Sequence, residues 1–230
     1  MPAGIKRKGF FMSEGKNIKF NLELFTVILL GITAVATGWS SWQGSMHGSL
    51  QSQKYTNATR LTAEASALYN EASSLMSQDM NIWNQIISMR LDYAFAEMTD
   101  NADEMERLEY KLAVIMADNV YEEFEKAIDW ADDQEEYASP FDNEDFLEHY
   151  FVDASELFEE AEAMMAAGDE NSTHGDNQGL VSVIYAVVLF MLGIVAPFKE
   201  ERTKRILLVI SVVGFIAATG FMLTIPAVFP

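Results

Sequence analysis

Three long apolar runs constrain this chain more than any other feature of its sequence. They cover residues 22–42, 180–198 and 206–225. Each is close to the roughly 20 residues that a helix needs to cross the hydrocarbon core of a bilayer. The second and third runs contain no charged residue, and the first contains only Glu23, within one turn of its start. The pattern therefore predicts three transmembrane helices with the lipid bilayer as their partner.

The basic residues that flank these runs predict how the chain is oriented. Five lie in residues 1–21 and four lie in residues 199–205, whereas residues 226–230 carry no charge. Basic residues favour the cytoplasmic side of a membrane. We therefore expect residues 1–21 and 199–205 in the cytoplasm of a cell-membrane protein, and residues 43–178 and 226–230 outside it. Trp39 and Trp42 would lie at the outer boundary, which suits amphipathic rings.

The start of the chain leaves two alternatives open. Ala34-Val35-Ala36 resembles a signal-peptidase site behind a basic region and a short apolar core, and cleavage there would leave two spans. The apolar run continues past this motif to a full membrane length, which favours an uncleaved first span. Met12 is a second possible start, because residues 1–11 add only further basic and aromatic residues.

The segment between the first two spans is strongly acidic. Residues 43–178 hold 31 of the 35 acids and six basic residues, a local charge of −25. This charge argues against nucleic acid as a partner, and we expect none, because phosphate binding needs clustered Lys and Arg. Oxygen-rich acidic surfaces suit divalent cations, so weak binding of such ions is expected.

Helix-forming residues dominate the acidic segment, and we expect it to fold as an antiparallel helical bundle in an all-α chain. Its first predicted helix covers about 45–76 and continues the first span. The second begins near Asp79, a good N-cap residue. The third covers about 103–137 and ends before Ser139-Pro140. Asn143 caps the fourth, which ends at Gly168.

Two boundaries of this bundle follow from further arguments. The chain must leave the membrane near Trp42 and return near Leu180, which an even number of antiparallel helices achieves with short turns. A break near Asp100 is therefore preferred, because one fused helix would be too long for the fourth helix to return along it. The polar residues 169–178 are expected to form a loop.

Chemistry-bearing motifs are scarce. The chain has no cysteine and three histidines, and it contains no paired Glu-x-x-His motif, phosphate loop or dinucleotide fingerprint. His149 has Asp145 and Asp153 one helical turn away on either side, which makes these three residues a weak candidate metal site. A surface histidine among acids is the commoner explanation. We expect neither enzymatic activity nor a cofactor.

The residues of the three spans also indicate a structural role. Their polar residues Thr33, Ser182, Ser211 and Thr219 can bond to their own helix backbone. Ala34 with Gly38, and Gly214 with Ala218, form pairs of small residues that let helices pack closely. Such contacts can form within one chain or between chains, and the need to pack three spans favours contacts within the chain.

The order of short motifs resembles a known group of proteins. Trp39, Trp42 and Gln43 follow the first span, and Tyr55, Ala58 and Glu64 lie in the next helix. Ser139-Pro140-Phe141, Gly175-Asp176, Val188-Leu189-Phe190 and Gly193 then occur in sequence. This arrangement resembles small three-span prokaryotic membrane proteins known only as a domain of unknown function. The resemblance covers nearly the whole chain and implies the same topology but no activity.

Three functional hypotheses follow. The first is a non-enzymatic scaffold or accessory protein that associates with itself or with a membrane complex. The second is an extracytoplasmic sensor that binds a ligand or cation. The third is a small oligomeric channel or transporter subunit with a pore lined by Thr33, Thr37 or Ser211. Asn57 and Asn171 both begin glycosylation acceptor tripeptides, and the expected loop favours Asn171 for modification.

Overall fold

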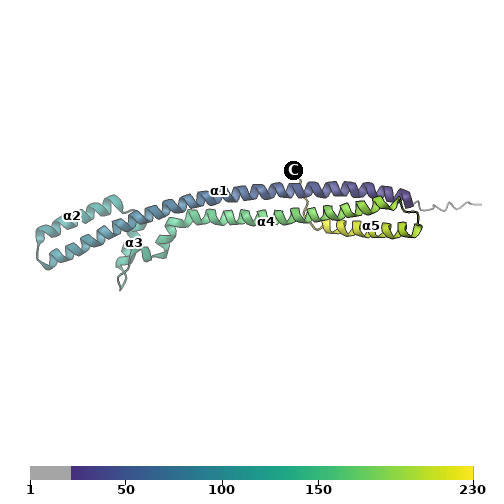
Figure 1. Cartoon of the computed structure of the whole chain (residues 1–230). Helices are drawn as coiled ribbons and strands as arrows, with labels where there is room; N and C mark the ends of the chain where they lie inside the picture. Colours follow the sequence, from purple (N-terminus) through teal and green to yellow (C-terminus); the bar gives the residue numbers. More distant parts are fainter. Residues whose placement is uncertain (1–21, 230) are drawn as a thin grey trace, which may run out of the picture. The chain divides into compact units, whose positions relative to one another are not determined.

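The computed structural model describes residues 22–229, which are helical and contain no strand. The all-α prediction is therefore confirmed for these residues, while the segment 1–21 with its alternative start lies outside them. In chain order the elements are α1 (Leu22–Met98), α2 (Ala102–Asn119), α3 (Glu122–Asp132), the short 3-10 helix η1 (Pro140–Asp142), α4 (Glu144–Val195) and α5 (Glu201–Met222) (Figure 1).

The described residues divide into two compact units. The first unit contains residues 22–48 and 173–229, and the second unit contains residues 49–172. Helices α1 and α4 each contribute to both units. The three helices that are long and apolar enough to cross a membrane are α1, α4 and α5. The expected set of three candidate spans is thus present, and the orientation stays a prediction.

Apolar side chains hold the three helical segments of the first unit together. One cluster joins α1, α4 and α5 through Leu29, Val188, Leu192 and Leu208. A second cluster contains Val181, Tyr185, Ala218 and Ile225. Many large side chains of the same helices point outward instead, among them Val35, Phe190 and Ile216. Outward apolar residues are what a helix needs when its surroundings are lipid.

The polar residues of the spans behave as expected from their sequence positions. The hydroxyl groups of Thr33 and Ser211 donate to carbonyl oxygens one turn earlier at 2.8 Å each, and both residues are fully buried. Ser182 and Thr219 make the same kind of bond. Because each hydroxyl bonds to a carbonyl of its own helix, none of them is left unpaired in an apolar environment, which would be costly.

The two predicted small-residue pairs differ in their contacts. An added Cβ at Gly214 would lie 3.0 Å from Val188 Cγ2, so α5 approaches α4 closely there, and Ala218 is fully buried. Gly38 has open space around its Cα, and Ala34 is exposed. The Gly214–Ala218 pair therefore serves packing within the chain, as favoured from sequence, whereas the Ala34–Gly38 pair does not.

The residues after α5 return to α1. The side-chain amide of Gln43 donates to the Val228 carbonyl at 2.9 Å, and its oxygen accepts from the Val228 N–H at 2.8 Å. His47 Nε2 lies 3.0 Å from the Pro226 carbonyl oxygen, and the Phe229 ring packs 6.2 Å from that of Trp39. The tail is thus held mainly through its backbone.

In the second unit, α1 ends where the sequence predicted a break. Asp100 has a left-handed backbone with φ of 54°. The N–H of Asn101 bonds to the Ala96 carbonyl, and that of Asp100 bonds to the Glu97 carbonyl, which is the Schellman pattern. The Asn101 side chain then accepts from Glu104 N and begins α2, which lies beside the end of α1 (Figure 1).

Two predicted helix starts have opposite outcomes. The Asn143 side chain accepts from Phe146 N at 3.2 Å and caps α4, so this prediction is confirmed. Ser139 and Asp142, just before it, form a capping box around η1. Asp79, in contrast, is not an N-cap. It lies inside the continuous helix α1, about five turns before the end of that helix, and the residue is only 8% exposed.

The predicted third helix is also divided in two. Instead of one helix over 103–137, α2 ends at Asn119 and α3 begins at Glu122, with Tyr121 in an extended conformation. The Tyr121 ring packs beside Phe124 and Phe146, and its hydroxyl bonds to Asp79. Tyr121 makes these tertiary contacts with an extended backbone, at the point where the predicted helix is interrupted. Helix α3 then ends at Asp132, five residues before the predicted end.

The expected helix end at Gly168 and the loop at 169–178 are both wrong, because α4 continues through them to Val195. An added Cβ at Gly168 would lie 2.5 Å from Tyr55 Cε1. The glycine therefore provides space for a ring from α1, not a helix cap. Tyr55 Oη also donates to Asp169 at 2.5 Å. Asn171, expected in a loop, is helical, and Asn57 is helical as expected.

Aromatic and aliphatic residues together form the core of the second unit. Trp83 and Ile86 from α1 pack with Phe124, Ala127 and Ile128 from α3 and with Phe146 from α4. The rings of Phe124 and Phe146 stack with centroids 5.5 Å apart. This core brings the start of α3, the start of α4 and the last third of α1 together, and thereby positions the site described next.

Candidate functional site

A buried carboxylate and two tyrosines meet beside this aromatic core. The hydroxyl of Tyr150, from α4, donates to Asp79 Oδ2 at 2.5 Å. The hydroxyl of Tyr121, from the α2–α3 junction, lies 2.9 Å from the same oxygen and 3.1 Å from the Tyr150 hydroxyl. Three elements thus converge on one carboxylate oxygen of α1.

Both tyrosines remain protonated donors over the physiological pH range. Burial is the main cause that raises the pKa of Tyr121 to about 12, and the Asp79 carboxylate acts in the same direction. Burial, followed by the hydrogen bond to Asp79, also raises the pKa of Tyr150 above its ordinary value. A protonated hydroxyl is what stabilises an ionised carboxylate in a partly apolar environment.

A cavity of about 390 Å³ opens beside this carboxylate. It is lined by residues of α1, α2, α4 and the α2–α3 junction, namely Leu75, Gln78, Asp79, Ile82, Asn119, Tyr121, His149 and Tyr150. Apolar, amide, aromatic and acidic groups therefore surround one space. Such a mixed lining is typical of small-molecule sites, where a few polar groups fix the orientation of a ligand.

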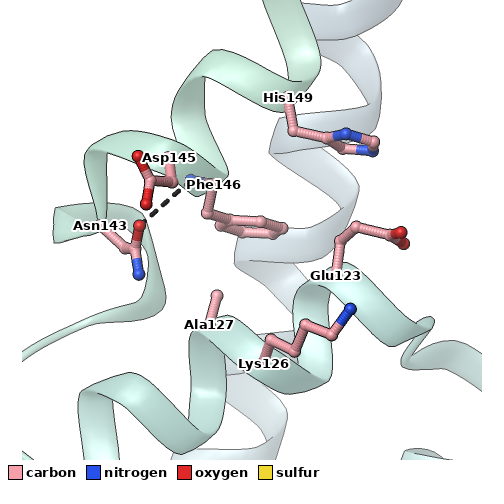
Figure 2. A pocket seen from close by; sticks show the side chains of 7 residues that line it. All are labelled: Glu123, Lys126, Ala127, Asn143, Asp145, Phe146 and His149. Carbon is pink, nitrogen blue, oxygen red and sulfur yellow. Dashed lines mark hydrogen bonds between the residues drawn. The ribbon is translucent and has the colours of Figure 1, made fainter.

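The predicted metal-site residues lie near a second cavity of about 290 Å³. Asp145 and His149 both line it, together with Glu123, Lys126, Ala127, Asn143 and Phe146, whereas Asp153 does not. Figure 2 shows the Asp145 carboxylate near Asn143 and the His149 ring on the other side of Phe146. Between residues 22 and 229, no group of three or more His, Asp or Glu side chains could hold a metal ion. The metal site stays a prediction.

Sequence reasoning missed Asp79, Tyr121 and Tyr150 as a unit, although it found their neighbour His149. The hydrogen bonds join residues that are 42 and 71 positions apart. Local spacing carries no signal for such a contact. One indication was available, since Asp79 shares an otherwise apolar helix face with Trp83 and Ile86.

Comparison of the chain with protein-family models, with curated proteins and with solved structures gave no match.

Proposed function

We propose that this chain is a multi-pass protein of the cell membrane that works by association rather than by catalysis. In this proposal it presents the acidic second unit outside the cytoplasm to a second copy of itself or to a membrane complex. The three apolar helices support membrane insertion, and the basic residues of 1–21 and 199–205 support this orientation. The resemblance to small three-span prokaryotic proteins of unknown function belongs to the same proposal.

One observation carries the association: an exposed apolar stripe near the end of α1. Leu91, Phe95 and Met98 follow one another at helical spacing and are 67%, 68% and 84% exposed. Residues at positions i, i+4 and i+7 share one helix face. Single exposed apolar residues are ordinary on protein surfaces, but a contiguous apolar stripe is typical of an interaction surface.

The chain has no cysteine, so a single introduced cysteine is the only thiol that a crosslinker can modify. Phe95→Cys would place one thiol in the stripe. Tyr137→Cys would place one at a position of the second unit that is 82% exposed and outside the stripe. With a short bis-maleimide added to native membranes, we expect Phe95→Cys to give a discrete dimer, and the same reagent to leave Tyr137→Cys monomeric.

A membrane-complex partner would give a different product. A heterobifunctional photoreactive maleimide attached at Phe95→Cys should then yield one adduct larger than the monomer, which mass spectrometry can identify. Equal, diffuse crosslinking of both variants, or none from either, would contradict the proposed association.

A sensor is the second candidate, and the cavity beside Asp79 favours it. The channel is the third candidate, and no observation favours it, because its proposed pore residues Thr33 and Ser211 are buried within the first unit of the single chain. Thr37 also bonds to its own helix, at Thr33 O.

A further inference from the structure

The Asp79 carboxylate has no cationic partner among residues 22–229. Its hydrogen bonds in this part of the chain come from the hydroxyls of Tyr121 and Tyr150 and end on Oδ2. None of the ion pairs that the structure shows involves Asp79. Removing an ionised carboxylate from water without a counter-charge is costly. Its burial therefore favours any cation that can reach it.

The second oxygen of this carboxylate is the accessible one. Between residues 22 and 229, every fully buried side-chain nitrogen or oxygen atom has a hydrogen-bond partner. Oδ1 accepts no hydrogen bond there, so Oδ1 cannot be fully buried. Oδ1 therefore remains in contact with open space, and the space that Asp79 lines is the cavity of about 390 Å³. One carboxylate oxygen is anchored by tyrosines, and the other is free to accept from a ligand.

The remaining walls select the kind of cation. Leu75 and Ile82 offer apolar surface, and Tyr121 and Tyr150 offer aromatic rings, whose faces attract cations. Gln78 and Asn119 add side-chain amides that can accept further N–H groups. A hard metal ion needs about six oxygen ligands around a small volume, whereas this cavity offers one free carboxylate oxygen in a large one.

The net negative charge of the chain also favours a cationic ligand, and it acts over longer distances than the contacts in the cavity. The chain has a formal charge of −20, and acids are concentrated in the segment that contains this cavity. An acidic surface raises the local concentration of cations and repels anions. Anionic ligands are therefore disfavoured both by the surface and by Asp79 itself.

We propose that the cavity bounded by Asp79, Tyr121 and Tyr150 binds a small alkylammonium ion, a class of ligand beyond the association described above. The ammonium group donates to Asp79 Oδ1, and its alkyl part packs against Leu75 and Ile82. The tyrosine hydroxyls hold Oδ2 and thereby orient the carboxylate toward the ligand. Binding and association use different residues, so either can fail without the other.

Isothermal titration of the full chain in detergent with n-butylammonium and with 1,5-diaminopentane tests this proposal. Butyrate serves as the anionic control. We expect one site per chain for the amines and none for butyrate. Asp79→Asn keeps the shape and an acceptor but removes the charge, and should weaken binding at least tenfold. Asp92→Asn, an exposed acid of the same helix, should change the affinity less than twofold.

Leu75→Trp provides a second variant that leaves all charges in place and fills the cavity from an exposed position. It too should weaken amine binding at least tenfold while circular dichroism stays unchanged. The proposal is overturned if no amine binds, or if a lysine-containing peptide binds where the free amines do not. Equal losses in Asp79→Asn and Asp92→Asn, with several weak sites, would instead show a diffuse cation atmosphere and likewise overturn it.

Discussion

At the scale of single residues, one carboxylate joins three parts of the second unit. Asp79 accepts from two tyrosines on different elements, and both hydroxyls lie beside the aromatic core. Without the carboxylate, Tyr150 would lose the acceptor of its hydroxyl, and Tyr121 would retain only the Tyr150 hydroxyl as an acceptor. A buried donor that loses its acceptor costs about 1–3 kcal/mol.

We therefore expect Asp79→Ala to lower the free energy of unfolding by about 1–3 kcal/mol. Denaturant unfolding of the full chain in detergent, followed by tryptophan fluorescence and circular dichroism, measures this change. Asp92→Ala in the same helix should change stability by less than 0.5 kcal/mol, about the usual limit for a surface substitution. Similar losses in both variants would show that the hydrogen bonds to Asp79 contribute little.

The same tyrosines predict how stability depends on pH. The pKa of Tyr121 is about 12 in the folded chain, against about 10 in an unfolded one. The folded state therefore holds its proton more tightly, and stability is complete below pH 10 and falls as pH rises through 12. Denaturation midpoints between pH 8 and 11.5 should decrease, and the decrease should be smaller in Tyr121→Phe with Tyr150→Phe.

At the scale of elements, the sequence predicted helix boundaries that arise from local chemistry. The reversal at Asp100 and Asn101 uses a left-handed residue and a side-chain cap, and the start of α4 uses the Asn143 cap. These signals lie within a few residues of the boundary. Three helical candidates for membrane spans were equally predictable, because span length and charge are properties of composition.

Boundaries set by distant contacts could not be predicted in the same way. Gly168 looks like a helix end, but the ring of Tyr55 fills the space above it. Tyr121 interrupts a helical pattern because Asp79 and Phe146 bind its side chain elsewhere in the fold. The candidate site follows the same rule. His149 was found through acids one turn away, whereas Asp79 and the tyrosines required the tertiary structure.

Two glycines of α4 should respond to alanine with opposite signs. Gly168→Ala would force the Tyr55 ring away and weaken its hydrogen bond to Asp169, so we expect destabilisation. Gly179 has open space around its Cα. Gly179→Ala should therefore stabilise the chain by about 0.5–1 kcal/mol, the usual gain in a helix interior. Thermal melts in one detergent measure the melting temperatures of both variants against the unmodified chain. A change in the same direction for both variants would contradict this explanation.

The turn after α3 is the segment of the second unit that we expect a protease to cut, instead of residues 169–178, where the sequence predicted a loop. Residues 169–178 are helical, whereas residues 133–137 lie beyond α3 in an exposed turn. A glutamate-specific protease added to intact spheroplasts should cut after Glu135 or Glu136. Cleavage near Glu200 and Glu201 should appear only after permeabilisation, if residues 199–205 are cytoplasmic. Mass spectrometry of the fragments distinguishes these sites, and early cleavage at Glu200 would reverse the proposed orientation.

At the scale of the whole molecule, the excess of acids between residues 43 and 178 is the main electrostatic feature. Ion pairs join Arg60, Arg90, Arg107 and Lys126 to acids, but residues 43–178 carry 31 acids and only six basic residues. Even with every base paired, most of these acids would have no basic partner. Repulsion between exposed charges decreases when salt shortens the Debye length, which is about 8 Å at physiological ionic strength.

We therefore expect the melting temperature of the full chain to rise with added sodium chloride and to rise further with millimolar calcium. The calcium effect should be gradual and spread over many acids. Melting curves at 20, 150 and 500 mM salt, compared at constant detergent, measure the first effect. An unchanged melting temperature would show that the acids are already well separated, and a sharp one-to-one calcium titration would direct attention to Asp145, His149 and Asp153.

The contact between Gln43 and the tail has a consequence for how related chains can diverge. Gln43 bonds to the backbone N–H and carbonyl of Val228, and the Val228 side chain takes no part in those bonds. Every residue except proline offers the same two backbone groups at that position. The residue at position 228 can therefore change while the hydrogen bonds persist. Few side chains, in contrast, could replace Gln43, because the replacement must have the same length and carry both a donor and an acceptor. Invariance should accordingly be found on the helix side of this contact and variability on the tail side.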